Sequence, residues 1–165
     1  MTIRMLVLDV DGVMTDGSIV LDGRGGEQKR FHVRDGFGIR LWKRMGGDVA
    51  IITGRSGDVV PQRAQELGIE HLYLGSPDKV ADLRDLSART EIPLDAMAFV
   101  GDDWPDLGAM KAVGYPIAPA DAEPRVKAIA RHVTNRNGGH GAVRDAVEHL
   151  LGLSNLMEAA SGLYD

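Results

Sequence analysis

The stretch LVLDVDGVMTDG, residues 6–17, decides the fold of this chain. Its apolar run ends in two aspartates, Asp9 and Asp11, and a glycine follows at once. Paired carboxylates repel each other unless a positive group lies between them or one of them holds a proton. A buried strand that ends in such a pair therefore predicts a site at its carboxyl end, where open α/β sheets bind their ligands.

Five more short apolar runs follow, and segments with apolar residues at helical spacing lie between them. This alternation predicts an α/β fold, a Rossmann-like parallel sheet with helices on both faces. The runs lack a polar side, as is typical of strands covered on both faces. Ser76 and Pro77 predict an N-cap and a first helical turn, and Gly46 and Gly68 predict helix ends. The expected strands are RMLVLDV, DVAIIT, HLYLG, MAFVG, GYPIAP and RHVTN.

Residues 18–33, SIVLDGRGGEQKRFHV, depart from this alternation. Two short strand-like runs flank a glycine-rich turn, the pattern of a β-hairpin. The hairpin takes the place where a crossover helix would normally follow the first strand. We expect it to project near the carboxyl edge of the sheet, as a flap over a site or as an oligomer contact.

The length of 165 residues predicts a single domain over residues 1–165. The formal charge of −5 argues against nucleic acid as the main partner. The absence of cysteine excludes disulfides, thiolate metal sites and cysteine catalysis. Residues 1–12 lack the pattern of a signal peptide, and no apolar stretch approaches the roughly 18 residues of a membrane span. We therefore expect a cytoplasmic protein with no membrane partner.

Polar residues follow the predicted strands at the edge where ligands bind. A set of oxygen ligands without cysteine suits Mg²⁺, which is typically coordinated by a few carboxylates and a substrate phosphate. Lysine and threonine can hold phosphoryl oxygens, and a carboxylate can attack phosphorus. A second carboxyl can move the proton that such a transfer needs. The residues are Asp9, Asp11, Thr53, Gly54, Arg55, Lys79, Asp102, Asp103 and Asp106.

The segments DVDGVMTDG, TGRS, Lys79 and GDDWPD resemble, in this order, the four motifs of the haloacid dehalogenase superfamily of phosphohydrolases. FHVRDGFGIRL, LYLGSPDK and NRNGGHGAVRDAVEHLL narrow the resemblance to 3-deoxy-D-manno-octulosonate 8-phosphate phosphatases and their relatives, which are capless. The resemblance covers nearly the whole chain. It implies Mg²⁺-dependent hydrolysis of a sugar-acid phosphate through an aspartyl-phosphate, as a step of lipopolysaccharide biosynthesis.

The resemblance also implies roles for single residues. Asp9 would be the nucleophile and a metal ligand. Asp11 would be the general acid and base and would offer its backbone carbonyl to the metal. Asp102 would be the third protein ligand of the metal.

The remaining motif residues are implied to bind or support the phosphoryl group. Thr53, Gly54 and Lys79 would contact its oxygens. Asp103 and Asp106 would support Lys79 or the metal site.

Four candidate substrate residues are Arg34, Asp35, Arg55 and His140. Arg34 and Asp35 fit a turn with a helix cap as well as a substrate contact. Arg55 fits a contact with the sugar carboxylate or a surface ion pair, and His140 fits a loop position or a ligand contact. Arginine after TG is typical of the octulosonate type, whereas relatives that act on nine-carbon sugar phosphates often have glutamate there.

Other interpretations stay open at this stage. An N-acylneuraminate or ketodeoxynonulosonate 9-phosphate is the main rival substrate. A phosphorylation-controlled receiver and a non-catalytic assembly subunit are rivals of a different class. The resemblance implies a homotetramer in which neighbouring subunits close the active site, and residues 153–165 fit a helix docked on a partner or a frayed end.

Overall fold

A six-stranded parallel sheet forms the centre of the molecule. The computed structural model describes residues 2–165. The strand order is β5-β4-β1-β6-β7-β8, and every neighbouring pair is parallel. All six strands lie within the predicted apolar runs, so the predicted fold class is confirmed. The strands are β1 (Met5–Leu8), β4 (Asp48–Ile52), β5 (His71–Tyr73), β6 (Met97–Val100), β7 (Tyr115–Ala118) and β8 (His132–Val133).

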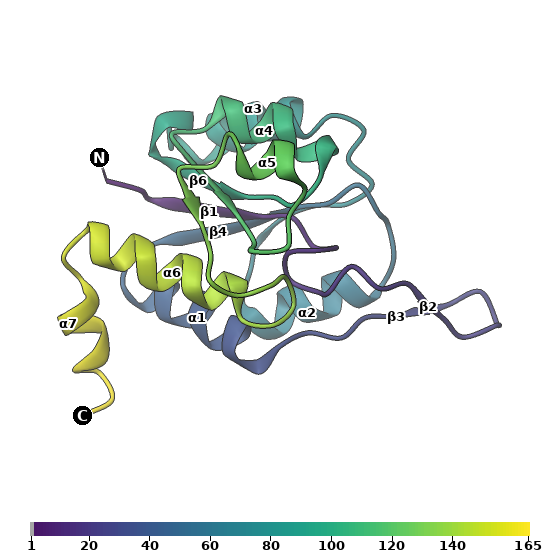
Figure 1. Ribbon diagram of the computed structural model, residues 1–165, viewed down its shortest axis with the longest axis horizontal. Coiled ribbons are helices and arrows are strands. Elements are labelled where there is room, and N and C mark those ends of the chain that lie inside the picture. Colours follow the sequence, from purple (N-terminus) through teal and green to yellow (C-terminus); the bar gives the residue numbers. More distant parts are fainter. Residues whose placement is uncertain (1) are drawn as a thin grey trace.

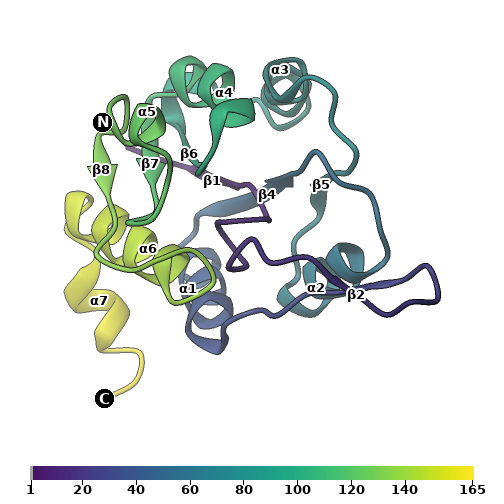
Figure 2. The same cartoon turned by 45° about the vertical axis from the view of Figure 1, so that its right-hand side comes forward.

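Helices cover both faces of this sheet (Figure 1). One face is covered by α1, α2 and α6, and the other by α3, α4 and α5 (Figures 1 and 2). The described helices are each too short or too polar to cross a membrane. Their bounds are α1 (Val33–Arg44), α2 (Val59–Leu67), α3 (Lys79–Thr90), α4 (Leu107–Ala112), α5 (Pro124–Lys127), α6 (Ala142–Leu153) and α7 (Met157–Ser161), with 3₁₀ turns η1 (Leu94–Ala96) and η2 (Trp104–Asp106).

The side chains of β1 alternate between two apolar layers. Met5 and Val7 belong to one core cluster, while Leu6 and Leu8 belong to the other. All four side chains are fully buried. Because helices cover both faces, each position of the strand is apolar, which is why the sequence shows no polar alternation there.

The ends of two helices test the predicted caps. Gly68 ends α2 in the left-handed conformation, with φ 68°, as predicted. The predicted N-cap at Ser76 is wrong, because α3 begins at Lys79 and is capped by Asp78. The Asp78 side chain accepts hydrogen bonds from Val80 N and Ala81 N at 2.9 and 3.1 Å. Aspartate is a strong N-cap, and it fixes the start of α3 on the residue that lines the site.

The expected hairpin follows β1 and projects from the body of the molecule (Figure 1). Its paired strands are short, β2 (Val20–Leu21) and β3 (Glu27–Gln28), with Leu21 opposite Glu27. The Asp22 carboxylate accepts hydrogen bonds from Arg24 N and Gly26 N and so closes the turn. The apolar residues of β2 are exposed, with Leu21 at 72%.

The C-terminal tail folds back on its own chain. Ala160 of α7 is buried in the core cluster of α1 and α6. The Tyr164 ring lies 5.2 Å from the Phe37 ring, and its hydroxyl accepts a hydrogen bond from Arg44 at 3.0 Å. Residues 153–165 therefore complete a hydrophobic layer of this subunit, a role that the sequence analysis did not consider.

Candidate active site

The central strand brings three of the motifs together. Because β1 lies between β4 and β6, the carboxyl ends of these strands are neighbours. Asp9 follows β1, Thr53 follows β4, and Asp102 follows β6 after one glycine. Asp9 N donates a hydrogen bond to Val100 O at 3.1 Å, and Thr53 N donates to Tyr73 O at 3.0 Å. The sheet hydrogen bonding thus continues into the motif residues and fixes where their side chains begin.

The fourth motif residue, Lys79, enters this edge from the first turn of α3. Its ammonium lies 2.8 Å from Asp9 Oδ1 and 2.6 Å from Asp106 Oδ1. All three side chains are buried. Burial by itself lowers the pKa of Lys79, but the attraction of the two carboxylates outweighs it, so the pKa is raised. Lys79 therefore stays charged and holds Asp9 in place.

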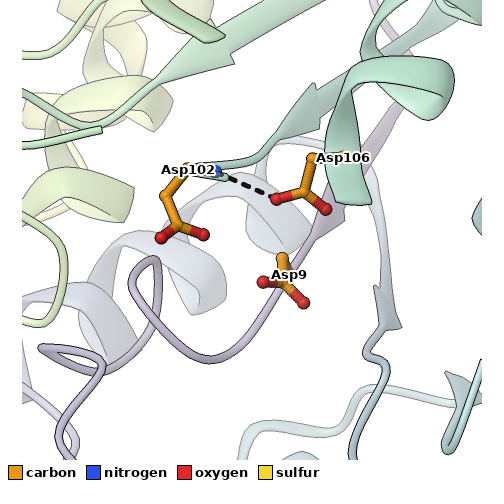
Figure 3. Close-up of side chains that lie close together, drawn as sticks. All are labelled: Asp9, Asp102 and Asp106. Atoms are coloured by element: carbon orange, nitrogen blue, oxygen red, sulfur yellow. Dashed lines mark hydrogen bonds between the residues drawn. The ribbon is translucent and has the colours of Figure 1, made fainter. Parts of the chain in front are cut away.

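Three carboxylates converge at this edge of the sheet (Figure 3). Asp9, Asp102 and Asp106 each offer an oxygen, and these oxygens lie within 4.8 Å of one another. Burial and then the Asp9 and Asp106 charges raise the pKa of Asp102 to about 8. Burial, followed by repulsion from Asp106, also raises the pKa of Asp9. One lysine does not balance three acids, so the cluster lacks positive charge.

This cluster fits a divalent cation such as Mg²⁺. Its donors are hard carboxylate oxygens, which Mg²⁺ prefers. A bound cation would favour the ionised carboxylates that burial and mutual repulsion disfavour. Gly12, with φ +86°, leaves room for the Asp102 carboxylate, because a Cβ at this position would overlap it. The residues present therefore suit the metal that the sequence predicts.

Asp106 also organises the loop after β6. Its Oδ2 accepts a hydrogen bond from Asp102 N at 3.0 Å (Figure 3). The same oxygen accepts a second hydrogen bond from Asp103 N at 3.4 Å. Asp103 in turn accepts from Trp104 N at 2.7 Å and caps η2. These contacts aim Asp102 into the cluster and hold Asp106 against Lys79.

Asp11 lies beside the cluster but points to the hairpin. Its Oδ1 accepts a hydrogen bond from Lys29 Nζ at 2.5 Å. Lys29 also lies 3.3 Å from Glu27, which accepts a hydrogen bond from Arg55 at 2.7 Å. Lys29 and Glu27 were not among the residues predicted from the sequence. Their spacing of two residues, which puts both side chains on one face of a strand, was the available signal.

Most predicted residues line one cleft of about 300 Å³. Thr53 is buried there, and its hydroxyl lies 3.4 Å from Arg55 N. Arg55 is half-exposed at the mouth, next to a second hollow between the hairpin and residues 55–59. The predicted residues in the lining are Asp9, Asp11, Thr53, Gly54, Arg55, Lys79, Asp102, Asp103 and Asp106.

The other candidate substrate residues lie outside this lining. Asp35 is buried, and its carboxylate accepts hydrogen bonds from Gly141 N and Arg144 N at the start of α6. Burial raises the pKa of Asp35. Arg34 and His140 are exposed, and His140 Nδ1 lies 2.8 Å from Gly138 O. Asp35 is therefore a helix cap, which is one of the two roles that its sequence pattern fits. It caps α6 and not its own helix: the bonded Gly141 N lies 106 residues further along the chain.

The loop that contains His140 packs against the turn that follows Asp9 in the first motif. Gly139 N donates a hydrogen bond to Val13 O at 3.0 Å. A Cβ at Gly138 would overlap the carbonyl of Gly12. The two glycines let this loop approach the turn after Asp9 closely, and the hydrogen bond from Gly139 N holds the loop to that turn.

Comparisons with known proteins identify the family of this chain. A family model described as haloacid dehalogenase-like hydrolase matches residues 75–146. Over 161 residues, the chain is 44% identical to 3-deoxy-D-manno-octulosonate 8-phosphate phosphatase of Yersinia pestis, covering 98% of this chain and 86% of that protein. This chain belongs to the 3-deoxy-D-manno-octulosonate 8-phosphate phosphatase family.

Solved structures of this phosphatase family have the same fold. The enzyme of Moraxella catarrhalis, in complex with a magnesium ion, a phosphate ion and a KDO molecule, is 38% identical with a TM-score of 0.95. That match covers 99% of this chain and 94% of the other. The cobalt-bound phosphatase of Haemophilus influenzae is 36% identical with a TM-score of 0.92, covering 99% and 98%.

Proposed function

We propose that this chain hydrolyses 3-deoxy-D-manno-octulosonate 8-phosphate to the free sugar acid and phosphate, with Mg²⁺ as its cofactor. The observation that supports this most directly is the buried Asp9 carboxylate, 2.8 Å from Lys79 Nζ and beside Asp102. Membership of the phosphatase family supports the substrate class. Lipopolysaccharide biosynthesis is the process that this substrate implies.

The reaction takes place in two steps on the residues of the cleft. The Thr53 hydroxyl, the Gly54 N–H and Lys79 hold the phosphoryl oxygens. An Asp9 oxygen attacks phosphorus and the ester P–O bond breaks, while Asp11 gives its proton to the leaving sugar oxygen. Water then attacks the phosphorus of the aspartyl-phosphate and gives a proton to Asp11. Phosphate leaves, and the Asp9 carboxylate is restored.

Mg²⁺ would be held by the Asp9 and Asp102 carboxylates and by the Asp11 backbone carbonyl. When bound, it neutralises charge that develops on the phosphoryl oxygens. Asp106 and Asp103 keep Asp102 and Lys79 in position through the contacts of the loop after β6. The acid sugar would meet Arg55 at the mouth of the cleft, where a guanidinium can hold a carboxylate in a bidentate pair.

A panel of phosphate esters tests the substrate. Phosphate release is measured with Mg²⁺ for the eight-carbon octulosonate ester and for the nine-carbon N-acylneuraminate and ketodeoxynonulosonate 9-phosphates. We expect the highest kcat/KM for the eight-carbon ester. A higher value for a nine-carbon ester would identify the rival substrate, and a stable phosphoprotein without turnover would identify a receiver.

We also propose a homotetramer in the cytoplasm, with the hairpins at its contacts. The apolar run Ile19 to Leu21 is exposed on the hairpin and suits an interface. The cysteine-free composition suits a reducing compartment. Light scattering at working concentration measures the assembly state, and a fully active monomer would contradict the idea that neighbours close the cleft.

Magnesium affinity should fall as the pH is lowered from 8.5 to 6.5. Asp102, with a pKa of about 8, and Asp9, with a raised pKa, take up protons over this range in the metal-free protein. Mg²⁺ must displace those protons, so affinity weakens by up to about tenfold per pH unit for each proton displaced. Calorimetric titration at several pH values measures this change. An affinity independent of pH would contradict the prediction.

A further inference from the structure

A buried lysine from the hairpin holds the carboxylate of Asp11. Lys29 follows β3, and its side chain is only 3% exposed. Its ammonium lies 2.5 Å from Asp11 Oδ1 and 3.3 Å from Glu27 Oε1. A lysine is almost never buried without a partner, and this one has two carboxylates. Lys29 therefore contributes a fixed positive charge next to the cleft.

The second oxygen of Asp11 has a different environment. Asp11 Oδ2 is buried and has no hydrogen-bond partner among the described residues. The Arg55 guanidinium is near it, with Nε at 3.9 Å, which is beyond hydrogen-bonding distance. A buried oxygen without a partner is uncommon in a folded protein and calls for an explanation, of which a catalytic role is one. Lys29 thus occupies one oxygen of Asp11 and leaves the other available for a proton.

Lys29 also accounts for the direction of the Asp11 side chain. The cluster of oxygens that suits a cation contains Asp9, Asp102 and Asp106, but not the side chain of Asp11. Asp11 is only two residues from Asp9, and a free carboxylate there would be attracted to a bound cation. The ion pair with Lys29 gives the Asp11 carboxylate a partner on the hairpin that competes with the cation.

We propose that Lys29 is a positioning residue for the acid and base step: it turns Asp11 away from the metal ligands and presents Oδ2 for proton transfer. This inference rests on the proposed role of Asp11. Glu27 assists because its Oε1 forms an ion pair with Lys29 Nζ at 3.3 Å. Its other oxygen, Oε2, forms an ion pair with Arg55 at 2.7 Å. The hairpin is therefore coupled to the chemistry through a chain of ion pairs, in addition to any role in assembly.

A series of simple phosphate esters without a carboxylate tests the inference. The leaving groups run from p-nitrophenol, which departs without a proton, through phenol to a plain alkanol, which needs one. kcat/KM is measured because it reports the steps up to the first irreversible one, and so isolates the departure of the leaving group. The absence of a carboxylate keeps Arg55 out of the comparison.

Lys29→Met should steepen the dependence of kcat/KM on the leaving group. We expect a loss of about 30-fold for the alkyl ester and less than about 3-fold for the nitrophenyl ester, since general acid catalysis is lost only where a proton is needed. Mg²⁺ affinity should not fall by more than about twofold. An equal loss on all esters, no loss on any, or a large loss of Mg²⁺ affinity would overturn the inference.

Two further variants complete the design. Glu27→Gln keeps the shape of the ion-pair network and should steepen the dependence of kcat/KM on the leaving group less than Lys29→Met does. It serves as the test if Lys29→Met does not fold. In that case, an unchanged dependence of kcat/KM on the leaving group would overturn the inference. Lys111→Met, an exposed change on α4, should leave the series unchanged.

Asp11→Asn separates this inference from the proposed function. If Asp11→Asn leaves the slope unchanged, the acid and base role of Asp11 is wrong and Lys29 has nothing to position. If Asp11→Asn steepens the slope and Lys29→Met does not, only the role of Lys29 is wrong.

Discussion

Asp9→Asn should lower kcat by about 10⁴-fold or more, on the sugar-acid phosphate and on p-nitrophenyl phosphate alike. An amide oxygen is a far weaker nucleophile than a carboxylate, and without the attack no aspartyl-phosphate forms. Both substrates lose the same step, because Asp9 attacks the phosphoryl group that they share. Steady-state phosphate release with Mg²⁺ measures the loss.

The same variant should remain folded. The raised pKa of Asp9 means that its surroundings disfavour the charged carboxylate, burial being the main cause. A neutral amide of the same shape relieves that penalty, while it weakens the pair with Lys79. We expect a Tm within a few degrees of wild type in metal-free buffer. Asp95→Asn, an exposed change in η1, is the control and should keep full activity. Activity above about 1% in Asp9→Asn would assign the nucleophile to another residue.

Lys79→Met should damage both stability and activity. The ammonium is the only cation within salt-bridge distance of Asp9 and Asp106 among the described residues. Removal of one partner from a buried pair leaves an uncompensated charge, which typically lowers the free energy of unfolding by about 3–5 kcal/mol. For a chain of this length that corresponds to a fall in Tm of about 6–20 °C. Thermal unfolding in metal-free buffer measures it.

The pH dependence of this loss has a definite sign. In the wild type, the pKa of Lys79 is raised, so its stabilising charge is fully present at neutral pH. In the variant, Asp9 and Asp106 repel each other when ionised, and protonation relieves the repulsion. The difference in Tm between wild type and variant should therefore shrink as the pH falls from 8 to 5. A difference that grows on acidification would contradict this account.

Activity provides a second readout for Lys79→Met. Lys79 both orients Asp9 and lines the cleft, where its charge would stabilise the phosphoryl oxygens. We expect kcat to fall by about 10³-fold, with the same loss on both substrates, because the phosphoryl group is common to them. Lys111→Met again serves as the exposed control. A loss confined to the sugar-acid phosphate would mean that Lys79 contacts the sugar instead.

The strands and the motif residues at their ends were predictable because both are local in sequence. A strand covered by helices on both faces needs an unbroken apolar run, and β1 with Asp9 behind it has that pattern. The carboxyl ends of neighbouring parallel strands must share one edge. Thr53 and Asp102 could therefore be assigned to the same edge as Asp9 before the strand order was known.

The caps and the tail were predicted less well. Ser76 and Asp78 both have side chains that can cap a helix, and only the path of the chain into α3 selects Asp78. Apolar residues recur at helical spacing along the tail, but the sequence does not show which surface they pack on; in the structure Ala160 is buried and Tyr164 packs on Phe37. Such docking depends on a surface that α1 and α6 create together, and neither helix has it alone.

The sequence by itself therefore determined the parallel sheet and the edge that holds its acids, because period and order along the chain govern both. The partners of those acids, and of Asp35 outside that edge, depend on how the chain packs in three dimensions. Lys29 reaches Asp11 across 18 residues, Lys79 reaches Asp9 across 70, and Asp35 caps α6 across 106. Charge pairing acts through space, so these contacts exist only once packing has brought distant segments to the same place.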